Sequence, residues 1–212
     1  MDRSEPDATP IPIPSLGRSV LTGSVGFCLA SLAVFATVAF AERWMYARLG
    51  LTGAYVAWTA LFILLGGAAL RPLVVESKQA GRFFALFALA FLAYAAGWVG
   101  AYFSLRGAVG EWVGSLAGSA LMGLIFAAGF GVLRTAPRLA GVLFVANTAG
   151  YFVGSWLNDA VGGKAGMLLW GSVYGLCLGA GLGATIFLAQ TVVSPSPLLP
   201  YSPSPQPPPS SE

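Results

Sequence analysis

Apolar residues gather in six stretches of about 20 residues each that carry almost no charge. In chain order, these stretches cover 19–41, 49–70, 83–105, 112–133, 139–158 and 165–193. A helix of about 20 residues crosses the roughly 30 Å hydrocarbon core of a bilayer. The pattern therefore predicts an all-α, polytopic membrane protein built as a six-transmembrane-helix bundle.

Polar segments separate and flank the apolar stretches. The five connectors are short and cover 42–48, 71–82, 106–111, 134–138 and 159–164. Short connectors make consecutive helices antiparallel neighbours. We expect a flexible N-terminal segment over 1–18 and one six-helix transmembrane domain over 19–193. The Pro/Ser-rich tail over 194–212 is expected to be disordered, because proline removes backbone donors and fixes φ.

The composition excludes a water-soluble domain. Hydrophobic residues make up 57% of the chain and charged residues 9%, and the mean hydropathy is +0.77. Soluble domains carry about 25% charged residues. The net charge is +3, but the 11 basic residues are spread along the whole chain and form no patch that would bind nucleic acid. The expected partner is therefore the lipid bilayer, with no nucleic acid.

The basic residues favour one orientation in the membrane. With the N-terminus in the cytoplasm, seven of them fall on the inner side: Arg3, Arg18, Arg71, Lys78, Arg82, Arg134 and Arg138. Four fall on the outer side: Arg43, Arg48, Arg106 and Lys164. Because cytoplasmic loops carry the excess of Lys and Arg, we expect a multi-pass protein of the plasma (inner) membrane with N- and C-termini cytoplasmic. The first stretch exceeds the roughly 7–15 apolar residues of a signal peptide, so we expect it to remain uncleaved.

Residues suited to catalysis are scarce. The chain has no histidine, which removes the commonest general base and metal ligand. Four carboxylates lie near the ends of the apolar stretches: Glu42, Glu76, Glu111 and Asp159. Cys28 and Cys177 lie inside apolar stretches, where cysteine behaves as a small apolar residue. We therefore expect no enzyme activity, no cofactor and no metal site.

Asn147 is the most unusual polar residue, because it lies near the centre of the fifth apolar stretch. A carboxamide at that depth needs partners inside the protein, and Tyr151 lies one helical turn further on the same face. One interpretation is an interhelical hydrogen bond that fixes packing. The other is a substrate-binding pocket formed with Trp156 and Trp170, which lie near the outer ends of their stretches. The solute would then be neutral or weakly polar, since the sequence places no charge near Asn147.

Glycine recurs at four-residue spacing in the last three apolar stretches. These residues are Gly114, Gly118, Gly150, Gly154, Gly171, Gly175, Gly179 and Gly183. Without side chains, such stripes let membrane helices approach closely. We therefore predict a bundle with tight glycine-mediated packing.

Two functional hypotheses follow from these patterns. The first is a small permease-like or substrate-capturing transport component for a neutral or weakly polar solute. The second is a non-catalytic accessory or scaffold subunit of a membrane protein complex. In that case, the glycine faces would pack against other membrane subunits or mediate self-association.

Overall fold

The computed structural model describes residues 13–75 and 80–193, and every regular element in this part of the chain is a helix. The long helices are α1 (Leu16–Leu70), α2 (Ala80–Leu105), α3 (Gly107–Gly129), α4 (Ala136–Val161) and α5 (Gly163–Val193). Two short 3-10 turns complete the described part, η1 (Arg71–Leu73) and η3 (Leu133–Thr135). The prediction of an all-α protein is confirmed. The flexible and disordered character predicted for 1–12 and 194–212 concerns segments outside the described residues.

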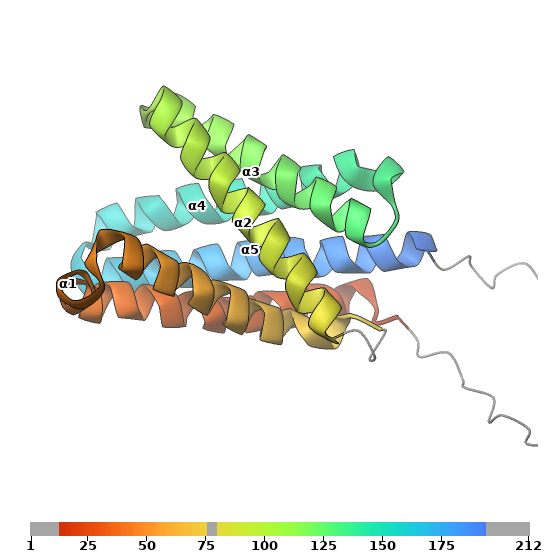
Figure 1. Cartoon of the computed structure of the whole chain (residues 1–212), viewed down its shortest axis with the longest axis horizontal. Coiled ribbons are helices and arrows are strands. Elements are labelled where there is room, and N and C mark those ends of the chain that lie inside the picture. The colour runs from red at the N-terminus through yellow and green to blue at the C-terminus, as the bar shows by residue number, and fades with distance from the viewer. Residues whose placement is uncertain (1–12, 76–79, 194–212) are drawn as a thin grey trace, which may run out of the picture.

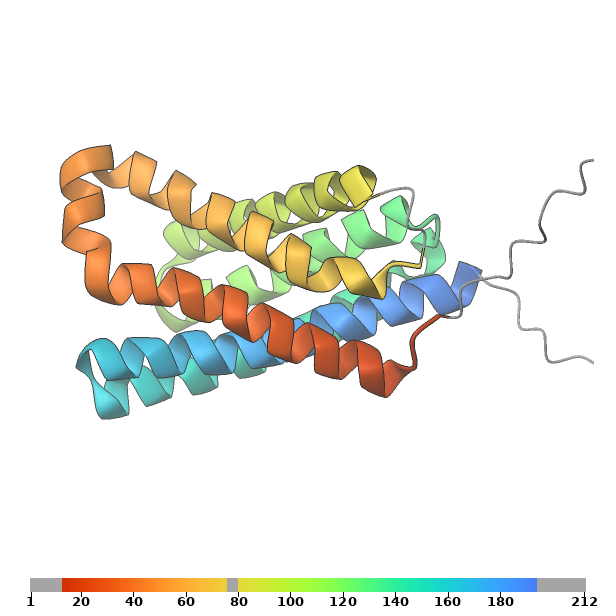
Figure 2. The ribbon, with the colours of Figure 1, turned by 90° about the horizontal axis from the view of Figure 1, so that it is seen from below.

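The first two predicted helices form the single element α1, which is broken at Gly50. The backbone there has φ 66 and ψ 178, far from helical values, and the chain turns back on itself between the two arms of α1 (Figure 2). The two arms run antiparallel (Figure 2) and are in contact, since Phe27 stacks on Phe62 with ring centroids 6.0 Å apart. The structure thus contains five helices long and apolar enough to span a membrane, and the predicted count of six is not confirmed.

The expected connector over 42–48 is helical, which corrects the sequence-based boundary. The segment contains neither glycine nor proline, so nothing in it breaks a helix. The break falls instead at Gly50, whose positive φ is readily available only to glycine. The amino-terminal boundary also shifts, because α1 begins at Leu16 after Ser15, whose side chain accepts a hydrogen bond from the backbone N–H of Arg18 at 3.3 Å.

The other connectors at this end of the bundle are shorter than predicted. Only Arg106 separates α2 from α3, and only Gly162 separates α4 from α5. Both have positive φ, 54 for Arg106 and 71 for Gly162. The next residue also has a positive φ in each case, 56 for Gly107 and 58 for Gly163. Two successive residues with positive φ therefore reverse the chain between two helices.

The helices pack as a series in which each element lies mainly against the next. From most to least extensive, the main interfaces are α1 with α5, α4 with α5, α2 with α3, and α3 with α4. α2 crosses the bundle obliquely and has a smaller interface with α1 (Figure 1). The start of α1, η1, the α3–α4 junction and the end of α5 lie together at one end, here called the terminal end (Figure 2). The break in α1 and the two one-residue junctions lie at the opposite end, here called the hairpin end.

The exterior of the bundle is apolar along its length. Large hydrophobic side chains are exposed on all five long helices, among them Leu29, Val56, Leu89, Leu116, Val145 and Leu176. The core is formed by Phe27, Phe87, Phe126, Met122 and a set of buried leucines. A protein with an apolar surface over an apolar core is suited to lipid surroundings. These helices support the predicted membrane and transmembrane character.

Glycines of α5 lie directly against the backbone of α1. A Cβ added at Gly175 would lie 2.7 Å from Cα of Cys28, and one added at Gly179 would meet the carbonyl oxygen of Gly23. All eight glycines of the predicted stripes are buried: Gly114, Gly118, Gly150, Gly154, Gly171, Gly175, Gly179 and Gly183. Their contacts are with helices of the same chain. How much stability these contacts contribute stays a prediction.

Candidate functional site

Asn147 lies at the centre of a hydrogen-bonded network that joins four helices. Its Nδ2 donates to Ser115 Oγ on α3 at 2.6 Å, and its Oδ1 accepts from the Tyr94 hydroxyl on α2 at 2.7 Å. The Tyr94 oxygen lies 3.0 Å from the hydroxyl oxygen of Tyr174 on α5. Because Tyr94 gives its one hydrogen to Asn147, Tyr174 is the donor in that second contact. We call Tyr94, Ser115, Asn147 and Tyr174 the polar network.

Three of the four residues of the polar network are shielded from the surroundings, and Tyr174 is half-buried. Asn147 and Ser115 are fully buried and Tyr94 nearly so. Gly118 allows α3 to approach α2 closely. A Cβ at this position would lie 2.9 Å from the backbone oxygen of Tyr94 and would force the two helices apart. Both polar atoms of the Asn147 side chain are therefore satisfied within the chain, as a buried amide requires.

Aromatic rings gather on the hairpin-end side of this network. We call this group the aromatic cluster, and it consists of Trp98, Tyr102, Tyr151 and Trp170. Trp98 stacks on Tyr102 with centroids 5.2 Å apart and lies 5.4 Å from Tyr151. Tyr151 in turn lies 5.7 Å from Trp170 in an edge-on arrangement. Helical spacing produces the alignment, since Trp98 and Tyr102 are four residues apart and share a face of α2.

Glu111 places a carboxylate beside the aromatic cluster. It lies in the second turn of α3 and is half-buried. The Tyr151 hydroxyl donates to Glu111 Oε1 at 3.3 Å. Trp98 adds an unused donor, because its Nε1 is buried without a hydrogen-bond partner among the described residues. The site thus combines ring faces, one carboxylate and one free N–H group.

The structure brings together some of the predicted site residues and separates another. Tyr151 and Trp170 contact each other, and Asn147 lies one turn from Tyr151 on α4. Trp156 is 67% exposed on the outside of α4 and makes no described contact with this group. Five residues beyond Tyr151, it falls on a different face of the helix.

Sequence reasoning missed most of the partners that complete these two groups: Tyr94, Trp98, Tyr102, Glu111, Ser115 and Tyr174. One signal was available, because Tyr94, Trp98 and Tyr102 repeat at four-residue spacing and so form one aromatic face of α2. No comparable signal connects Glu111 with Tyr151, which lies 40 residues away on another helix. The hydrogen-bond partners of Asn147 are uncharged, but Glu111 places a charge at Tyr151, the next site residue along α4.

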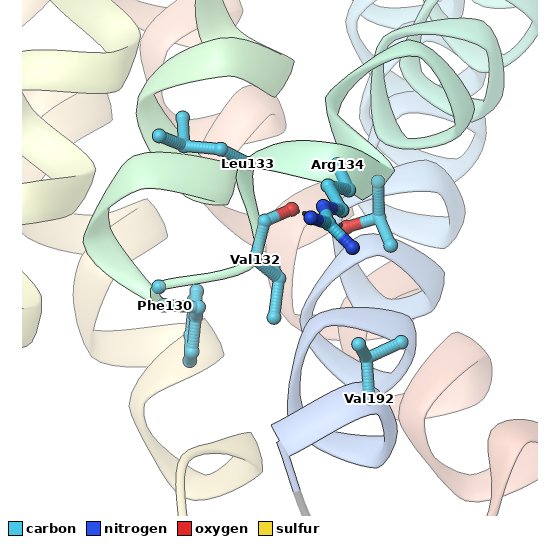
Figure 3. A pocket seen from close by; sticks show the side chains of 7 residues that line it. Phe130, Val132, Leu133, Arg134 and Val192 are labelled. Atoms are coloured by element: carbon cyan, nitrogen blue, oxygen red, sulfur yellow. Dashed lines mark hydrogen bonds between the residues drawn. The ribbon is translucent and has the colours of Figure 1, made fainter.

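A pocket of about 600 Å³ lies at the terminal end, far from both groups along the helices. It is formed by the α3–α4 junction and the last turn of α5, with lining residues Phe130, Gly131, Val132, Leu133, Arg134, Thr135 and Val192 (Figure 3). Arg134 is the charged residue of this lining. No predicted site residue lines it.

Within 13–75 and 80–193, no group of three or more His, Cys, Asp or Glu residues is placed to hold a metal ion. Comparison of the chain with protein-family models, curated proteins and solved structures gave no significant match. The class of protein therefore follows from the fold itself. It is an all-α protein whose long apolar helices have transmembrane character.

Proposed function

We propose that the protein is a substrate-capturing component of the plasma (inner) membrane that crosses the bilayer six times with both termini cytoplasmic. The two antiparallel arms of α1 would each cross once, which supports six crossings from five helical elements. The described chain begins and ends at the terminal end. Five basic residues of the described chain lie in the segments at or next to that end: Arg18, Arg71, Arg82, Arg134 and Arg138. Their number supports a cytoplasmic terminal end.

The solute would bind at the aromatic cluster beside Glu111, on the opposite side of the membrane. The observation that carries this proposal is the contact between the Tyr151 hydroxyl and the half-buried Glu111 carboxylate. A carboxylate next to ring faces favours a positively charged group, because the carboxylate pairs with it and the rings attract it through their quadrupoles. We therefore propose a small organic amine in place of the neutral solute expected from the sequence.

The proposal is tested with choline as the cationic probe and 3,3-dimethylbutan-1-ol as its uncharged counterpart of similar shape. Purified protein in mild detergent is titrated with each while thermal unfolding is followed. We expect choline to raise the unfolding temperature of the wild-type protein and not of Glu111→Gln. Asp159→Asn is the matched control, because Asp159 is an exposed carboxylate at the same end. An equal response to both probes, or an unchanged response in Glu111→Gln, would refute the amine site.

A second function is supported by the polar network. Both polar atoms of the Asn147 amide form hydrogen bonds, to Tyr94 and Ser115, and the residue has no exposed surface, which favours a structural role for it. On that basis, the protein would be a non-catalytic accessory or scaffold subunit. Since the glycines of the predicted stripes contact helices of this chain, partner subunits would bind its exposed apolar faces. Mass measurement of the particle extracted in mild detergent tests this, because a scaffold should retain a partner chain or a second copy.

A further inference from the structure

The terminal-end pocket is a direct result of how the chain passes from α3 to α4. α3 ends at Gly129, Gly131 takes a positive φ of 73, and η3 follows before α4 begins at Ala136. This detour carries the backbone past the last turn of α5 and leaves a space of about 600 Å³ facing Val192 (Figure 3). The backbone of the α3–α4 junction therefore forms the pocket.

The walls of this pocket are apolar and continue onto the outer surface. Phe130, Val132, Leu133 and Val192 provide them. Leu133 is 59% exposed and Val192 is 52% exposed. Val192 lies in the last turn of α5, and Leu133 begins the apolar stretch that runs through η3 into α4. An acyl chain lying along the bundle could therefore extend along them without leaving the hydrocarbon layer.

One positive charge lies in this apolar setting. Arg134 is exposed, and no hydrogen bond or ion pair with another described residue occupies its guanidinium group. The lining contains no acidic residue. The Thr135 hydroxyl is already used, since it donates to the Val132 carbonyl oxygen at 2.7 Å. The amino-terminal end of α4 begins beside Arg134 and adds to the positive potential through its aligned peptide dipoles.

We propose that this pocket binds an anionic phospholipid, with its phosphate on the Arg134 guanidinium and an acyl chain along Leu133 and Val192. A guanidinium group binds phosphate through two parallel N–H donors. Basic pockets at the ends of transmembrane helices suit acidic head groups. The apolar walls favour a lipid over a free phosphate ion, which would gain nothing from Leu133 or Val192. This inference stands independently of the amine site proposed above.

The test measures retained lipid. Full-length protein is reconstituted into vesicles of phosphatidylcholine and phosphatidylglycerol, extracted, and analysed by native mass spectrometry. We expect bound phosphatidylglycerol on the wild-type protein and about a tenfold loss in Arg134→Gln, which corresponds to removal of one charge-assisted contact. Arg138→Gln is the matched control, because Arg138 is exposed one turn into α4 and does not line the pocket. Thermal unfolding confirms that each variant is folded.

Further experiments distinguish a lipid from the other possible occupants of the pocket. Val192→Asn should also lower phosphatidylglycerol retention if an acyl chain lies on that wall. Displacement of the lipid by inorganic phosphate alone, with Val192→Asn behaving as wild type, would indicate a site for a soluble anion. If only protein truncated after residue 193 retains lipid, the C-terminal segment fills the pocket. Either result would overturn the proposal, as would equal retention by Arg134→Gln and Arg138→Gln.

Discussion

The Asn147 side chain is central to the hydrogen bonds that connect four helices of the bundle. Its amide bonds to Ser115 on α3 and Tyr94 on α2, and Tyr94 passes the connection to Tyr174 on α5. In an apolar medium no water replaces a lost partner. Removing the amide would therefore leave the Ser115 hydroxyl without its donor and deprive Tyr94 of its acceptor.

Replacing Asn147 with leucine tests this role. Asn147→Leu keeps the volume approximately and removes both hydrogen bonds, so we expect a loss of about 1–2 kcal/mol in the free energy of unfolding. The neighbouring Thr148→Val is the control, because the Thr148 hydroxyl is buried without a described partner and its removal should be neutral or slightly stabilising. Unfolding in detergent with increasing denaturant measures both. Equal stability of the two variants would contradict a structural role for the network.

The burial of Asn147 could be predicted from the sequence, but its hydrogen-bond partners could not. A lone amide in an apolar stretch has to find hydrogen bonds, so its burial follows from the residue itself. Which groups meet it depends on how each helix is rotated about its axis. That rotation is set by packing between helices distant in the chain, as the bond between Asn147 and Tyr94 shows. Glu111 was missed for the same reason.

Among the elements, α1 departs most from the sequence-based prediction. Its second arm, 51–70, has the length of about 30 Å expected for one crossing. The first arm, 16–49, is longer, at about 50 Å. Its last turns contain Glu42, Arg43 and Arg48. The positions of the charged residues therefore predicted where the apolar surface ends, but they did not predict where the helix ends. Gly50 determines the reversal because φ 66 with ψ 178 is accessible essentially only to glycine.

The interface between α1 and α5 offers a direct test of glycine packing. A methyl group at Gly179 would meet the carbonyl oxygen of Gly23 and lie 2.8 Å from the Phe27 Cβ. Backbone atoms cannot move aside as a flexible side chain can, so Gly179→Ala should lower the free energy of unfolding by about 1–3 kcal/mol. Chemical unfolding in detergent measures the change.

Gly100→Ala is the control for this experiment. Gly100 is exposed on α2 and has no atom within 4 Å of an added Cβ, so the change should be neutral or slightly stabilising. Gly162 and Gly163 are unsuitable controls, because their positive φ values of 71 and 58 would strain any substitution. If Gly179→Ala is tolerated as well as Gly100→Ala, the glycine contacts do not limit the approach of α1 and α5.

For the whole molecule, the packing order explains why the two ends of the bundle differ. α1 and α5, the first and last long helices, form the most extensive interface, so the start and end of the described chain lie side by side at the terminal end (Figure 2). The α3–α4 junction and the Arg134 pocket lie there too. The aromatic cluster and Glu111 lie toward the opposite end. Two chemically distinct ends of one apolar bundle are what an oriented membrane protein requires.

The number and direction of crossings are tested by reporters of sidedness. If both arms of α1 cross the membrane, reporters joined after Arg48 and after Lys164 should lie outside, and one joined after Glu76 should lie in the cytoplasm. The seven basic residues expected on the inner side against four outside set this direction. Finding Arg48 and Glu76 on the same side would mean that 51–70 does not cross, and the count would fall to five. If the three positions alternate but Glu76 lies outside, six crossings stand and the orientation is inverted, which would place Glu111 and the aromatic cluster on the cytoplasmic side.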